Sequence, residues 1–84
     1  MLHIVFFARV KEQLGCAKLE LEWGSDLSTV AGLQEHLCER NNGQWREVLS
    51  EDNIIRAVNH TVVSGDAALR DNDEVAFYPP VTGG

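Results

Sequence analysis

The segment Leu2-His3-Ile4-Val5-Phe6-Phe7-Ala8-Arg9 decides the fold, because its apolar residues follow one another directly. An uninterrupted apolar run predicts a strand that is covered on both faces, whereas a half-exposed strand alternates apolar and polar residues. The run is too short to cross a bilayer, which takes about 20 apolar residues. We therefore expect a strand from Leu2 to Arg9 that needs cover on both of its faces.

The residues that follow predict a short helical turn and a second strand. Val10 to Leu14 can form one helical turn that ends at Gly15, and Lys18 to Glu22 alternate as a half-buried strand does. We expect the two strands to pair in the antiparallel direction.

A main helix is predicted next, from an apolar stripe with helical spacing. Its members are Leu27, Val30, Leu33 and Leu37. Asp26 or Ser28 can cap its first turn, and Asn41 to Gly43 supply a stop signal. Gly32 inside the helix costs about 1 kcal/mol relative to Ala. Close packing of the helix on a sheet would explain this glycine, and so would neutral drift.

The C-terminal half predicts a short helical piece and three strands. Trp45, Val48 and Leu49 have the spacing of that helical piece, and a polar break follows at residues 50–53. The predicted strands are Ile54 to Val58, Thr61 to Val63 and Glu74 to Tyr78. Asn59-His60 can form a two-residue hairpin turn, because Asn tolerates a positive φ.

Together these elements predict an α+β domain over residues 1–84, with the order ββαβββ and the main helix across one face of the sheet. If Ile4 and Phe6 face the helix, the pleat places Val5 and Phe7 on the other face. The last strand behaves in the same way and leaves Ala76 and Tyr78 on that face. A curled sheet could half-cover these residues, but we favour a docking patch.

The last six residues, Pro79 to Gly84, form the second informative segment. The two prolines cannot continue a ladder of hydrogen bonds, so an extended tail with a reach of at most about 20 Å is expected. Gly83 and Gly84 lack Cβ atoms and could pass through a narrow channel in a partner. The terminal carboxyl would then be open to attack. A frayed terminus is the alternative interpretation.

Charge and composition exclude several classes of function. Seven Lys and Arg residues against 13 Asp and Glu give a formal net charge of -6, which opposes binding to nucleic acid. We expect no membrane partner and a cytoplasmic location, because the chain shows neither a bilayer-spanning run nor a signal peptide. Cys16 and Cys38 lack a CxxC spacing, so we expect reduced thiols and no metal site.

The C-terminal dozen residues carry a family resemblance, supported by Phe6-Phe7-Ala8 and Ala57-Val58-Asn59. Those residues are Asp73-Glu74-Val75-Ala76-Phe77-Tyr78-Pro79-Pro80-Val81-Thr82-Gly83-Gly84. With them the chain resembles the small sulfur-carrier subunits of molybdopterin synthase over its whole length. The resemblance implies a ubiquitin-like β-grasp fold, with a mixed five-stranded sheet and one main helix on one face. Asn72 stands where we expect this family often to have Gly, but Asn also tolerates a positive φ.

The same resemblance implies a function and its partners. A ubiquitin-activating-enzyme-like adenylyltransferase would use ATP to adenylate the carboxylate of Gly84, which is then converted to a thiocarboxylate. The large subunit of the synthase would use this sulfur on a pyranopterin precursor in molybdenum cofactor biosynthesis. Two small and two large subunits are expected to form a heterotetramer. The carrier itself would bind no cofactor, and the catalytic side chains would belong to the large subunit.

The resemblance also implies which residues bind the partner. Phe7, Val62 and Tyr78 would form the patch that meets the large subunit. The tail residues Pro79, Pro80, Val81, Thr82 and Gly83 would enter its active site and deliver Gly84. Two other hypotheses remain at this point. The chain could be a carrier for thiamine or tRNA thiolation or a protein modifier, or it could be an interaction module without acyl chemistry.

Overall fold

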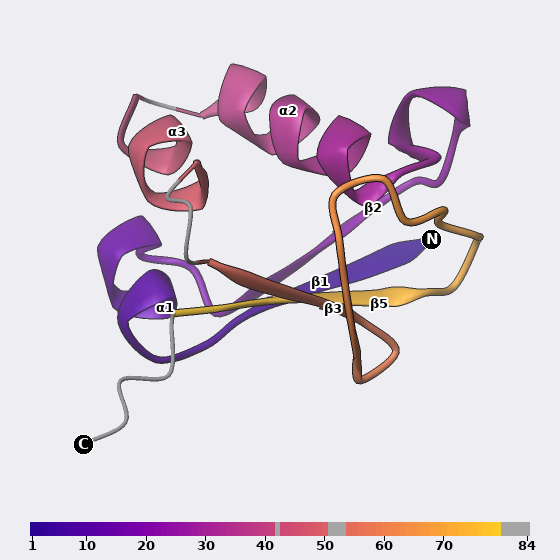
Figure 1. The fold of residues 1–84 in the computed structure, drawn as a ribbon. Coiled ribbons are helices and arrows are strands. Elements are labelled where there is room, and N and C mark those ends of the chain that lie inside the picture. The colour runs from indigo at the N-terminus through magenta and orange to yellow at the C-terminus, as the bar shows by residue number, and fades with distance from the viewer. Residues whose placement is uncertain (42, 51–53, 80–84) are drawn as a thin grey trace.

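The computed structural model describes residues 1–41, 43–50 and 54–79, and within these ranges it contains a mixed β-sheet with helices (Figure 1). The elements are β1 (Leu2–Phe6), α1 (Ala8–Leu14), β2 (Lys18–Leu21), a 3-10 turn (Ser25–Leu27), α2 (Val30–Arg40), α3 (Gly43–Leu49), β3 (Ile55–Val58), β4 (Thr61–Val63) and β5 (Glu74–Tyr78). The predicted order of strands, main helix and two short helical pieces is therefore confirmed, and the 3-10 turn is an addition.

The five strands lie in the order β2-β1-β5-β3-β4. β1 pairs with β2 in the antiparallel direction, as predicted, and with β5 in the parallel direction. β3 is antiparallel to both β4 and β5. Helices α2 and α3 lie on one side of this sheet (Figure 1). The first and last strands are thus neighbours at the centre of the sheet.

The first strand is shorter than the sequence predicts. It ends at Phe6 instead of Arg9, because Ala8 adopts a positive φ of 51° and begins α1 two residues earlier than expected. This helix ends as predicted at Gly15, whose φ of 66° lies in the left-handed region that glycine adopts without a steric penalty.

The N-cap of α2 is Thr29, so the prediction of Asp26 or Ser28 was wrong. Thr29 is extended and its Oγ1 accepts a hydrogen bond from Gly32 N at 3.0 Å. Asp26 instead lies within the 3-10 turn, and Ser28 has helical φ and ψ. A side chain caps a helix from a non-helical backbone position, which only Thr29 of these three residues provides.

The helix ends at Arg40, and Asn41 Nδ2 then donates a hydrogen bond to Leu37 O at 2.7 Å. Gly43 was predicted to belong to the stop signal of this helix. That prediction was wrong, because Gly43 is the first residue of α3. Asn42 and residues 51–53 of the predicted polar break lie outside the described residues.

Two turns carry the positive φ values that the sequence predicts. Asn59 and His60 have φ of 49° and 72° in the β3–β4 hairpin. These values match a type I′ turn, which follows the twist of the two strands. Asn72, in the turn before β5, also has a positive φ, of 75°.

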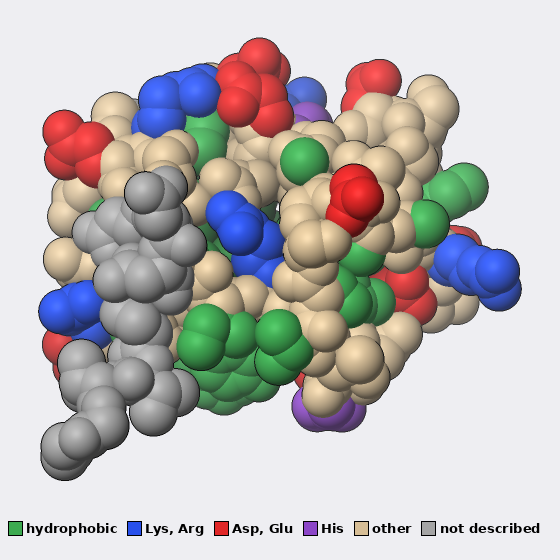
Figure 2. Space-filling view, viewed as in Figure 1, with side chains coloured by type: hydrophobic (Ala, Val, Ile, Leu, Met, Phe, Trp, Pro, Cys, Tyr) green, Lys and Arg blue, Asp and Glu red, His purple; other side chains and the backbone are tan. Residues whose placement is uncertain are grey.

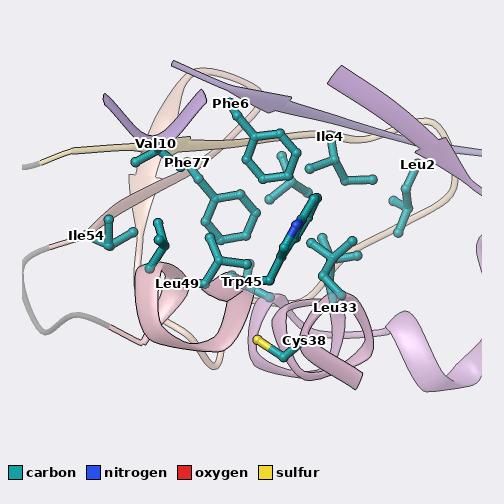
Figure 3. Packing of buried hydrophobic residues seen from close by; sticks show 14 of the residues in the cluster. Leu2, Ile4, Phe6, Val10, Leu33, Cys38, Trp45, Leu49, Ile54 and Phe77 are labelled. Atoms are coloured by element: carbon teal, nitrogen blue, oxygen red, sulfur yellow. The ribbon is translucent and has the colours of Figure 1, made fainter. Parts of the chain in front are cut away.

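The core lies between the sheet and the helices (Figure 3). Phe6 and Phe77, which come from the two central strands, stack with ring centroids 5.7 Å apart. Trp45 of α3 meets the Phe6 ring edge-on at 5.4 Å. Ile4, Phe6, Val75 and Phe77 are fully buried, which confirms the predicted inward side of the pleat. Aromatic pairs of this kind add stability beyond the area that they bury.

The structure explains why position 32 in α2 is a glycine, and the reason is not close packing on the sheet. A Cβ at this position would lie 2.9 Å from Asp26 O and 3.2 Å from Thr29 Oγ1, both N-terminal to its own helical turn. We expect Gly32→Ala to lower the free energy of unfolding by about 1 to 2 kcal/mol, because the clash exceeds the gain in helix propensity. Urea denaturation measures the effect. Gly43→Ala, with no atom within 4 Å of the added Cβ, is the control and should not destabilise the protein.

Candidate functional site

The candidate site is the face of the sheet that points away from α2 and α3. One row of side chains crosses this face in register: Val5 of β1, Ala76 of β5, Ala57 of β3 and Val62 of β4. The two alanines are only 2 to 3% exposed, because they lie between larger neighbours. In Figure 2, hydrophobic side chains gather below the strands on this side. The predicted outward side of the pleat is therefore confirmed.

Phe7 and Tyr78 form a stacked pair at one end of this face. Their rings are nearly parallel, with an interplanar angle of 3° and centroids 4.7 Å apart. Phe7 N also donates a hydrogen bond to Phe77 O at 3.2 Å. Phe7 remains 40% exposed, and Tyr78 is half-buried. Because β1 and β5 are parallel, their C-terminal ends lie side by side at the same edge of the sheet. The stacked pair is therefore next to the point where β5 leads into Pro79.

The three predicted patch residues share one face, but they do not form one cluster. Val62 is 70% exposed and lies on β4, whereas Phe7 follows β1. β5 and β3 separate these two strands, so the distance across the sheet is about 14 Å. Ile55 pairs in register with Tyr78 and therefore lies on the same face, next to the stacked pair. Ile55 was not predicted as a site residue, although alternation with Arg56 on β3 could have indicated it.

Of the predicted tail residues, the structure describes only Pro79. Pro79 is half-buried and directly follows β5. Pro80, Val81, Thr82, Gly83 and Gly84 lie outside the described residues.

The opposite end of the open face is polar. His3 Nδ1 lies 3.0 Å from Glu20 Oε2, and His60 Nε2 lies 3.4 Å from Glu74 Oε2. His3 pairs in register with both Glu20 and Glu74, so these three residues form a second row across β2, β1 and β5. Beside the row is a shallow hollow of about 420 Å³, lined by His3, Ile4, Val5, Lys18, Leu19, Glu20 and Glu74.

The described residues offer little chemistry of their own. They contain no group of three or more His, Cys, Asp or Glu side chains that could hold a metal ion. Cys38 is buried, and desolvation raises the pKa of its thiol, which makes it a poor nucleophile at neutral pH. None of the helices in this part of the chain is long and apolar enough to cross a bilayer. What the open face does offer is an apolar row and an exposed aromatic pair, an arrangement suited to docking.

Comparisons with known proteins identify the class. The chain belongs to the ThiS family, which matches it over residues 4–84. It is 42% identical to the molybdopterin synthase sulfur carrier subunit of Escherichia coli and 36% identical to that of Haemophilus influenzae. Each alignment spans 84 residues and 100% of both chains. The family resemblance predicted from the sequence is thus confirmed.

A solved structure supports the fold. The chain superposes with a TM-score of 0.68 on a chain from the complex of subunits 1 and 2 of molybdopterin-converting factor from Helicobacter pylori. The identity is 21%, and the superposition covers 99% of this chain and 97% of the other. Together with the mixed sheet order, this likeness confirms the predicted ubiquitin-like β-grasp.

Ala8, which follows the stacked Phe7, has a left-handed backbone with φ of 51°. We expect Ala8→Val to lower the free energy of unfolding by about 1 to 2 kcal/mol, because a β-branched residue is strained at this φ. Ala8→Gly removes the strain and serves as the matched comparison in thermal denaturation. Equal stability of the Val and Gly variants would contradict the left-handed conformation.

Proposed function

We propose that this chain is the sulfur-carrier subunit of molybdopterin synthase and that Gly84 carries the sulfur. The observation that carries the proposal is the full-length family match, which extends through Gly84. The exposed stacked pair at the end of β5 supports it, because a partner docked there would lie next to the start of the tail.

The chemistry needs only the terminal carboxylate. A carboxylate is a poor electrophile, so an oxygen of Gly84 first attacks the α-phosphate of ATP, and pyrophosphate leaves. Hydrosulfide, as sulfur at the sulfide oxidation level, then attacks the acyl carbon, AMP leaves, and the thiocarboxylate remains. ATP is used by the activating partner and is not bound by the carrier. No nucleophilic side chain of the carrier takes part, which agrees with the sparse chemistry of the described residues.

Two partners follow from this proposal. One is an adenylyltransferase that resembles ubiquitin-activating enzymes. The other is the large subunit of the synthase, in a heterotetramer of two small and two large subunits, where the catalytic side chains reside. A large-subunit partner is supported by the Helicobacter pylori complex, in which a chain of this fold is one of two subunits. We place these steps in the cytoplasm, with neither nucleic acid nor membrane as a partner.

The docking mode uses the open face of the sheet. Phe7 and Tyr78 act as the central anchor, and Val62 contacts the partner at the far edge of the same face. The segment Pro79, Pro80, Val81, Thr82 and Gly83 enters the active site of the large subunit and delivers Gly84. Exposed aromatic residues next to a tail root are suited to this task, since aromatic side chains dominate the energetics of interfaces.

The position of the terminal carboxylate should be essential. Deleting Gly84, or adding one residue after it, should abolish thiocarboxylate formation and leave the thermal unfolding temperature unchanged, because the core formed by the described residues runs from Leu2 to Phe77. Mass spectrometry of carrier incubated with the activating enzyme, ATP and a sulfur donor measures a gain of about 16 Da, the difference between sulfur and oxygen. Normal sulfur transfer by the extended chain would sink the proposal. Transfer from the wild-type carrier to an acceptor other than the pyranopterin would indicate another thiolation pathway.

Phe7→Glu should weaken binding to the large subunit at least tenfold. Burying a large apolar side chain contributes about 1.5 to 3 kcal/mol, and about 1.4 kcal/mol already corresponds to a tenfold change. Isothermal titration calorimetry measures the affinity. Ala31→Glu is the control, because Ala31 is an exposed residue of α2 on the helix side of the sheet, and the substitution introduces the same charge away from the open face. Equal affinity of folded wild type and Phe7→Glu would exclude Phe7 as an anchor.

A further inference from the structure

The polar end of the open face has features that the proposed function does not use. Glu20 and Glu74 flank His3 across three neighbouring strands, and each carboxylate has one oxygen, Oε2, within reach of a histidine. No hydrogen bond or ion pair within the described ranges uses Oε1 of either residue. Each carboxylate thus retains an acceptor for a further partner.

The hollow beside these carboxylates has a defined charge. Its lining contains two glutamates and one lysine, which gives a formal net charge of -1 with His3 neutral. The side chain of Glu74 is only 38% exposed, so its charge is screened less by solvent than that of a fully exposed residue. A cationic side chain complements such a site, whereas an anionic one is repelled.

The hollow is also continuous with the apolar part of the face. Val5 lines it and belongs at the same time to the row that crosses to Val62. Glu74 and Tyr78 are the first and last residues of β5, so about 13 Å of strand separates the carboxylate from the stacked pair. A protein that covers the patch and extends along β5 therefore reaches the hollow.

Apolar contact alone does not fix how a partner is turned. Burial of the Phe7 and Tyr78 rings is non-directional, so without further contacts it allows rotation of the partner about the stacked pair. A charged contact about 13 Å away prevents this rotation and thereby fixes register. Orientation matters for a carrier, because its tail must enter one site in the partner.

We propose that Glu20 and Glu74 form an orienting contact that receives a lysine or arginine side chain of the synthase large subunit. The contact rests on the proposed function, since the same subunit covers Phe7 and Tyr78. Of the two partners, the large subunit is the one that the Helicobacter pylori complex supports, because a chain of this fold is one of its two subunits.

The test measures binding of the purified large subunit to glutamine variants of the full carrier by stopped-flow and calorimetry. Glu20→Gln and Glu74→Gln should each raise Kd about threefold, and the double variant about tenfold, mainly through a slower association rate. The double variant should also depend less on salt, so that its affinity and that of the wild type converge as the salt concentration rises. Glu39→Gln, on α2 at the other face, is the charge-matched control and should bind like the wild type.

Two results would overturn the proposal. One is a double variant with the Kd and the salt dependence of the wild type, and the other is an equal loss in Glu39→Gln, which would show a general effect of net charge. If wild type binds the large subunit and Phe7→Glu does not, while the glutamine variants are unaffected, only the orienting contact fails. If wild type itself does not bind, the proposed function fails as well.

Discussion

The parallel pairing of β1 with β5 is the constraint on which the rest of the structure depends. It brings two segments about 70 residues apart in the chain into one register, with Phe6 opposite Phe77. On the inner side, these two rings stack and meet Trp45 to form the centre of the core. One residue further along, the pleat turns Phe7 and Tyr78 outward as a second stack. A single register thus produces both the core and the surface that we propose for docking.

This arrangement separates stability from chemistry. The helices cover one face of the sheet and bury its aromatic residues, while the other face keeps its larger side chains accessible (Figures 1 and 2). A substitution such as Phe7→Glu therefore changes the open face without making a cavity in the core. The reaction that we propose takes place at the end of the chain, apart from the residues that stabilise the fold.

Much of the fold could be predicted from local patterns. The apolar run at the start, the Asn59-His60 turn and the alternation in β5 each depend on neighbours in sequence. The structure has a strand, a turn and a strand at these places, although β1 ends at Phe6 and only one of its faces is fully covered. The cap of α2 could not be predicted, because Thr29 is extended where it bridges to Ala68, far along the chain. The early end of β1 depends on a positive φ at an alanine, for which the sequence carries no signal. Within the candidate site, the pleat predicted Phe7 and Tyr78, but the place of Val62 and the row from Glu20 to Glu74 depend on strand order and register.

The lengths of the outermost strands have a consequence for the behaviour of the protein at high concentration. β2 and β4 are the two edge strands of the sheet and have only four and three residues, respectively. An unpaired edge strand can form hydrogen bonds with a strand of another molecule, and an accessible apolar face would strengthen such aggregation. Because these edge strands are short, they offer an incoming strand few backbone groups for hydrogen bonds. The charged side chains of Lys18 and Glu20 on β2 further disfavour such pairing. The carrier can thus leave one face open for its partners with little risk of self-assembly into fibrils.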